Sequence, residues 1–151
     1  MATKKKKKTA TKPTPKPKAA GTATRKVSAK KVDNAADVAR KTALLVASAA
    51  LDNKAANVEI IDVRGKVDYA DYVVIMSGRS DRHVSALARN IEDALRTAGQ
   101  RCLGIEGLPK ASWLLLDFGD VIVHVFHHDM RGYYDLERLW IDAARVAVEG
   151  A

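Results

Sequence analysis

The chain has 151 residues, and its charge is divided unevenly between its two ends. Of its 26 Lys and Arg side chains, 12 lie in residues 1–32, which contain no acid; the remaining residues carry a net charge of −4. The chain is therefore a mildly acidic body with a strongly basic tail, which excludes a uniformly basic protein. A lone cysteine excludes a disulfide framework and a CxxC zinc ribbon, and the longest apolar run is too short for a membrane span of about 20 residues. With no apolar secretory signal at the N-terminus, we expect a cytoplasmic protein.

Residues 1–33 form a Lys/Pro-rich segment of low complexity, with five consecutive lysines at Lys4–Lys8. Such a composition cannot bury enough apolar surface to offset the entropy lost on ordering, so we predict a disordered tail. Two roles stay open, an electrostatic arm for rRNA phosphates and a solubilising tail. The segment has no aromatic side chain to stack on bases, which argues against sequence-specific RNA reading.

Residues 34–151 read as one domain of alternating helices and strands. Its first half predicts a helix over 35–52, a strand over 58–63, a buried strand over 72–76 and a helix that begins at Ser80.

The second half predicts strands over 101–105, 113–118 and 121–126, then a helix over 133–144. Gly119-Asp120 fits the two-residue type II′ turn of a hairpin. The order is αββαβββα, and hairpins mixed with helical crossovers indicate an α+β fold with a mixed five-stranded sheet covered by helices.

The segment Ser77-Gly78-Arg79-Ser80 joins a predicted strand to a helix, as phosphate-binding turns do. It also resembles the Gly-Ser turn of nucleotidyltransferases, whose chemistry needs two carboxylates on one strand face. No such pair follows, since Glu92 and Asp93 are adjacent on a helix and diverge by about 100°. We therefore expect a tight turn with a helix cap, and no catalytic residue.

A cluster of metal-ligating side chains closes the hairpin: His124, His127, His128 and Asp129. On a strand, only His124 and His128 would share a face, and a closed site would need another ligand from elsewhere. We expect a polar cluster at a strand end, with no metal site and no cofactor.

The hairpin strand offers the strongest candidate for binding. Alternation places Trp113, Leu115 and Asp117 on one face and Leu114, Leu116 and Phe118 on the other. Periodicity alone favours the core for both faces and leaves a partner site open.

Motif blocks from about Ala36 to Val146 resemble the ribosomal silencing factor family, also called Iojap-like. The blocks are Asp62-Val63-Arg64, Ala70-Asp71-Tyr72, Ser77-Gly78-x-Ser80-x-Arg82, Glu106-Gly107, Trp113-x-Leu115-Leu116-Asp117-x-Gly119-Asp120 with Val121 to Phe126, and Arg131-x-x-Tyr134-Asp135-Leu136-Glu137-Arg138-Leu139-Trp140.

This resemblance implies a nucleotidyltransferase-like fold without catalysis. It implies binding to the large ribosomal subunit, on large-subunit ribosomal protein fourteen, where the factor blocks joining of the small subunit and represses translation when nutrients are low. It also implies a homodimer off the ribosome and a partner surface that includes Trp113. Strand-face geometry extends that surface to Leu115, Asp117 and Asp120. The alternatives are a nucleotidyltransferase-like enzyme and a nonspecific RNA-binding protein led by its tail.

Overall fold

Six strands form one mixed sheet in the computed structural model, which describes residues 29–107 and 112–149. The strands are β1 (Ala56–Asp62), β2 (Tyr72–Gly78), β3 (Gly104–Gly107), β4 (Trp113–Asp117), β5 (Val121–His127) and β6 (Arg145–Val146). The helices are α3 (Ala29–Asp52), α4 (Asp81–Thr97) and α5 (His128–Tyr134), followed by the 3-10 helix η2 (Leu136–Trp140). Contacts divide the chain between Asp37 and Val38, and the packing below concerns the second unit.

The strand order across the sheet is β3-β4-β5-β2-β1-β6. Strands β2 and β5 are parallel, and the other neighbours are antiparallel. The predicted α+β class and mixed sheet are therefore confirmed. The predicted count of five strands was one too low, because the short β6 pairs with β1 through Ile60 and Val146.

The end of the domain departs most from the sequence prediction. In place of one helix over 133–144, α5 ends at Tyr134 because Asp135 adopts a left-handed conformation with φ 46°. The tighter 3-10 helix that follows turns Trp140 into the core and leaves Leu139 68% exposed. Helical periodicity fails here because the two short helices do not share a continuous face.

Two other elements begin at residues that differ from the prediction. Helix α3 begins at Ala29, inside the segment predicted as tail, and β3 begins at Gly104 and not at residue 101. The predicted disorder of residues 1–28 lies outside the described residues.

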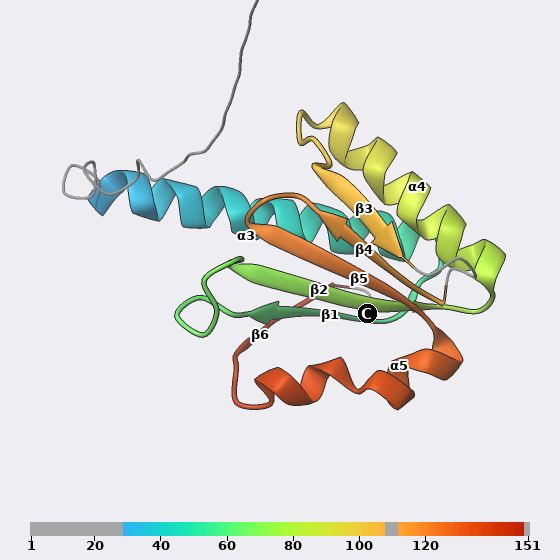
Figure 1. The fold of residues 1–151 in the computed structure, drawn as a ribbon. Coiled ribbons are helices and arrows are strands. Elements are labelled where there is room, and N and C mark those ends of the chain that lie inside the picture. Colours follow the sequence, from blue (N-terminus) through green and yellow to red (C-terminus); the bar gives the residue numbers. More distant parts are fainter. Residues whose placement is uncertain (1–28, 108–111, 150–151) are drawn as a thin grey trace, which may run out of the picture. The chain divides into compact units, whose positions relative to one another are not determined.

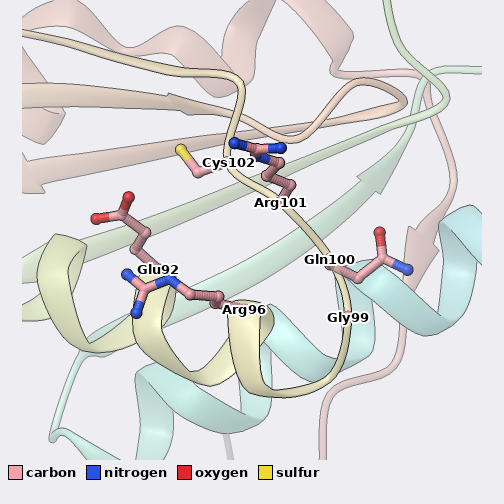
Figure 2. Close-up of a pocket in the computed structure, with 6 residues that line it drawn as sticks. All are labelled: Glu92, Arg96, Gly99, Gln100, Arg101 and Cys102. Carbon is pink, nitrogen blue, oxygen red and sulfur yellow. The ribbon is translucent and has the colours of Figure 1, made fainter.

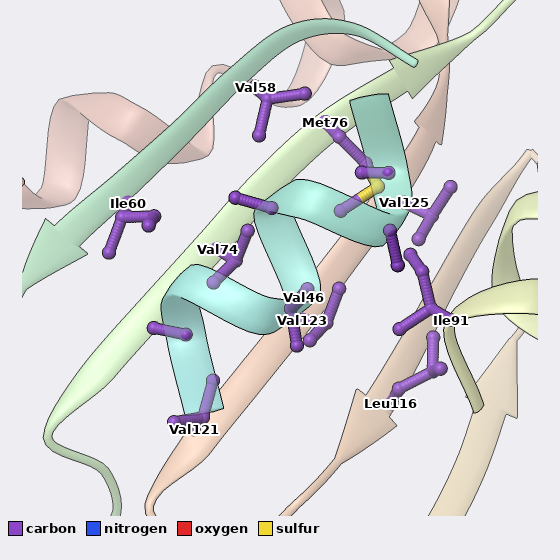
Figure 3. Packing of buried hydrophobic residues seen from close by; sticks show 14 of the residues in the cluster. Val46, Val58, Ile60, Val74, Met76, Ile91, Leu116, Val121, Val123 and Val125 are labelled. Atoms are coloured by element: carbon purple, nitrogen blue, oxygen red, sulfur yellow. The ribbon is translucent and has the colours of Figure 1, made fainter. Parts of the chain in front are cut away.

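One face of the sheet is covered by α4 and by the part of α3 from Val38 onward. Buried alanines on α3, among them Ala43, Ala47 and Ala50, place its backbone close to the sheet. Helix α4 adds Leu87 and Ile91 to the same cluster. Figure 3 shows Val46 of α3 over the strands, with Ile91 of α4 next to Leu116.

The other face carries a smaller core under α5 and η2, which lie on the opposite side of the sheet from α3 and α4 (Figure 1). Its buried residues include Ile75, Phe126 and Trp140. Because these two helices are short, the cover is less extensive on this side. In the part of the chain that the structure describes, no helix has the length and apolar character needed to cross a membrane.

Candidate functional site

The two faces of β4 have different surroundings. Leu114 and Leu116 pack with the core under α3 and α4. Trp113 and Leu115 pack at the margin of the smaller core on the other face, and both stay partly exposed. The predicted division of the strand into two faces is confirmed. Trp113, Leu115 and Asp117 all stay partly exposed, whereas on the other face Leu116 and Phe118 are buried and Leu114 stays partly exposed.

Trp113 sits within a group of aromatic rings. Its ring stacks on Phe126, its partner across the hairpin, with a centroid distance of 5.0 Å. Tyr134, the last residue of α5, lies at 4.6 Å in a tilted arrangement and is 39% exposed. The indole is therefore held between the rings of Phe126 and Tyr134, and part of it faces solvent.

The polar end of the indole is also fixed. The Nε1–H of Trp113 donates a hydrogen bond to Nδ1 of His124, at 3.1 Å. Burial lowers the pKa of His124 to about 4, so the ring is neutral at physiological pH and carries its proton on Nε2. This bond sets the orientation of the indole without a charge beneath it.

A shallow hollow of about 340 Å³ lies beside the indole. It is lined by Glu106, Gly107, Trp113 and Leu115. Glu106 on β3 is the register partner of Leu115 on β4, so both side chains project from the same face. An apolar floor with a carboxylate at its rim suits a partner that presents an apolar side chain next to a cation.

The two aspartates of the predicted surface lie at the far end of the hairpin. Asp117 accepts a hydrogen bond from the Gly119 N–H at 2.8 Å, and Gly119 has the positive φ of 91° that a type II′ turn requires. Asp120 is exposed in the turn, and its carbonyl accepts the N–H of Asp71 at 2.7 Å. Asp117 lies four residue steps along the strand from Trp113, or about 13 Å away. The structure therefore brings Trp113 and Leu115 together and places Asp117 and Asp120 apart from them.

Negative charge gathers at this turn. Partial burial raises the pKa of Asp71, and the neighbouring carboxylate of Asp120 raises it further. Arg64 forms its ion pair with Asp62, at 2.7 Å, and its charge acts in the opposite direction by lowering the pKa of Asp71. The turn is thus an acidic rim at one end of a face whose other end is aromatic.

Comparison with known proteins assigns the chain. Residues 36–151 match the family model described as "Ribosomal silencing factor during starvation". The chain belongs to this ribosomal silencing factor family. The resemblance carried by the motif blocks is confirmed.

Relatives and solved structures agree with the assignment. "Ribosomal silencing factor RsfS" of Bacillus subtilis (strain 168) is 46% identical over 105 residues, covering 69% of this chain and 89% of the relative. A crystal structure of a Chromobacterium violaceum protein matches with a TM-score of 0.66 and 30% identity, over 75% of this chain and 93% of that one. A more distant mouse relative, "Mitochondrial assembly of ribosomal large subunit protein 1", is 34% identical over 84 residues, covering 54% of this chain and 37% of the relative.

In this silencing-factor domain, sequence reasoning missed three neighbours of Trp113. The Gly119-Asp120 turn fixes the hairpin register, so the pairing of Trp113 with Phe126 could have been found. The contacts with His124 and Tyr134 depend on side-chain packing and on the left-handed end of α5, and no local pattern signals them.

The segment Ser77-Gly78-Arg79-Ser80 joins β2 to α4 and packs the helix against the strand. A Cβ at Gly78 would lie 2.9 Å from Val84, so glycine permits the close approach of α4 to β2. Ser80 caps α4 by accepting the His83 N–H, as predicted. The Ser77 hydroxyl accepts a hydrogen bond from Arg131.

The carboxylates near this turn are engaged by the same arginine. Arg131 is buried and contacts Glu137 at 2.8 Å and Glu59 at 3.6 Å. Together with Ser77 they line a hollow of about 600 Å³. A buried guanidinium between two carboxylates neutralises the charge that a pair of catalytic metal ions would need.

The histidine cluster is smaller than the sequence suggested, because His124 points into the aromatic group. His127, His128 and Asp129 remain, with ligand atoms within 4.8 Å of one another, and these three could hold a metal ion. In the structure His127 is the N-cap residue of α5, and its Nδ1 accepts the Asp129 N–H at 3.1 Å, while His128 and Asp129 begin the helix. His127 is the last residue of β5, so the cluster lies at a strand end, as expected.

Proposed function

We propose that the protein binds the large ribosomal subunit at the face that meets the small subunit, on large-subunit ribosomal protein fourteen. Occupancy of that face blocks subunit joining and represses translation when nutrients are low. The function is steric, with no reaction and no cofactor, and it operates in the cytoplasm. Family membership is the starting point, and the name of the mouse relative associates that protein with the large subunit.

The observation that carries the proposal is the state of Trp113. The indole is partly exposed and is fixed in orientation by Phe126, Tyr134 and His124. An aromatic ring that is already ordered loses little conformational entropy on binding, which is the condition for an anchor at an interface. The adjoining hollow supplies apolar area beside it.

Charge supports a protein as the partner of this face. Asp71, Asp117 and Asp120 surround the hairpin turn, and Glu106 borders the hollow. These carboxylates would repel bare RNA phosphates and attract a basic ribosomal protein. We place Trp113 and Leu115 at the centre of the contact and Asp117 and Asp120 at its rim.

Two further parts of the proposal rest on the charge of the tail and on the family resemblance. The basic tail reaches rRNA near the binding site, and the protein is a homodimer when it is off the ribosome. The nucleotidyltransferase-like alternative loses support from the engagement of Glu59 and Glu137 by Arg131.

Sedimentation of the full-length protein with purified subunits tests the proposal. We expect the wild type to travel with large subunits and not with small subunits. Trp113→Ala should remain in the supernatant, while Tyr69→Ala, which removes a 60% exposed aromatic ring from another loop, should bind as the wild type does. Equal binding to both subunits would favour the tail-led RNA-binding alternative.

A further inference from the structure

The outer face of α4 carries a regular row of positive charge. Its buried residues are Val84, Leu87, Ala88, Ile91 and Leu95. Arg82, Arg89 and Arg96 are exposed and recur every seven residues, which is close to two helical turns. The three side chains therefore share one line along the helix, about 21 Å long. We call them the arginine row.

The row has little part in holding the fold together. In the described part of the chain, Arg82 and Arg89 make no hydrogen bond or ion pair through their side chains. Arg96 pairs with Asp93 at 3.0 Å, with both side chains more than half exposed, so solvent screens that pair. Guanidinium groups on other elements, such as those of Arg64 and Arg131, are matched by carboxylates. Two unmatched cations on one helix of an acidic body are available for a ligand.

Positive charge continues beyond the end of the helix. A hollow of about 500 Å³ follows there, lined by Glu92, Arg96, Gly99, Gln100, Arg101 and Cys102. Figure 2 shows Arg96 on the helix and Arg101 on the segment that faces it across the hollow. Burial raises the pKa of the Cys102 thiol, so the thiol is protonated and adds no negative charge. Glu92 is the acidic group that lines this hollow, and the two guanidinium groups of Arg96 and Arg101 outnumber it.

We propose that the arginine row binds the phosphate backbone of an RNA helix of the large subunit, as a contact separate from the hairpin surface. This inference rests on the proposed function. Guanidinium groups pair with phosphate oxygens, and a line of them along a helix is the footprint of backbone binding. Residues 81–97 contain no Phe, Tyr or Trp, so the row positions the protein on RNA without reading bases.

The row and the hairpin surface do not compete for one ligand. Helix α4 packs on the face of the sheet that buries Leu116, and Trp113 projects from the other. A basic protein on the acidic and aromatic face and an RNA backbone on the row would each meet a surface of complementary charge.

Salt dependence of binding to purified large subunits tests the row. We compare the full-length wild type with Arg82→Gln/Arg89→Gln. The control Lys66→Gln/Arg138→Gln removes the same charge from two side chains that already face Asp142 and Asp135. The slope of log K against log salt should become shallower by about 1.4–1.8 in the row variant, since each phosphate contact contributes about 0.7–0.9. The control should keep the wild-type slope, and equal slopes for all three proteins would overturn the inference.

A photo-crosslinking amino acid at position 86 tests the identity of the ligand. Ala86 lies one turn from Arg82 on the same side of α4. On large subunits, we expect the crosslinks to join it to rRNA. Crosslinks to a ribosomal protein alone would contradict the inference and leave Trp113-dependent binding intact. If the wild type does not bind large subunits at all, the proposed function fails as well, so the two failures are distinguishable.

Discussion

The two faces of β4 show how one short strand serves both folding and binding. On one face, Leu116 is fully buried beneath long helices that cover the sheet. On the other, Trp113 and Leu115 lie where the short α5 and η2 give only partial cover. The residues on both faces are largely apolar, so side-chain type does not distinguish core from interface. The length of the covering helices distinguishes the core face from the interface face.

Substitution on the buried face should have the largest effect. Leu116→Ala removes a side chain with no exposed surface and should lower the free energy of unfolding by about 2–5 kcal/mol. Chemical denaturation measures this change. At temperatures where the variant is still folded, its affinity for large subunits should stay within a few-fold of the wild type. A loss of affinity in the folded variant would contradict the assignment of this face to folding alone.

Trp113→Ala should show the opposite pattern. We expect affinity for large subunits to fall about 30- to 1,000-fold, the 2–4 kcal/mol of a desolvated aromatic anchor. Because the ring is only partly buried, unfolding should cost about 2 kcal/mol less, below the 3–5 kcal/mol typical of a fully buried aromatic residue. The two measurements are made on one preparation. Full loss of stability, or unchanged binding by the folded variant, would assign Trp113 to the core.

The open face should also give the domain a pH dependence. The pKa of His124 is about 4 in the folded protein and 6.5 in the unfolded chain, so between these values the unfolded chain binds a proton that the folded protein excludes. The free energy of unfolding should therefore fall as pH drops from about 6.5 to 4, by about 3 kcal/mol in total, and this contribution should be constant above pH 7.

His124→Gln is the control for this effect, because glutamine does not titrate. The difference in unfolding free energy between wild type and variant should shrink or change sign across the same pH window. If that difference stayed constant with pH, burial would not prevent protonation of His124. The indole would then not be bonded to a neutral ring.

The aspartates at the turn should have the smallest effects. Asp117→Asn retains an oxygen that can accept the Gly119 N–H, so stability should change by less than about 1 kcal/mol. Asp117→Asn and Asp120→Asn should each weaken binding by less than about 1 kcal/mol, mainly through slower association at low salt, as expected for charges at a rim. A loss as large as that of Trp113→Ala would move the centre of the interface to the turn.

The sequence was sufficient where the structure is determined locally. The Ser80 cap and the spacing of Val84, Leu87 and Ile91 define α4, and the Gly119-Asp120 turn sets the register and the two faces of the hairpin. Those features placed Trp113 and Leu116 on opposite faces of the strand, and the family resemblance then named Trp113 as the partner residue.

The remainder depends on contacts between distant residues. The two-residue β6 exists only because β1 offers a free edge, and no periodicity marks so short a strand. The left-handed Asp135 ends α5 and sets Tyr134 against Trp113, which a helical pattern through residue 144 concealed. The extent of cover on each face, which decides that Trp113 stays partly open, follows from that break.

Subunit joining measured by light scattering tests the central claim most directly. Purified large subunits are saturated with protein, saturation is verified by sedimentation, and small subunits are then added. We predict that wild type and Tyr69→Ala prevent joining, while Trp113→Ala at the same concentration allows it. Normal joining by large subunits that are saturated with the wild-type protein would contradict the account.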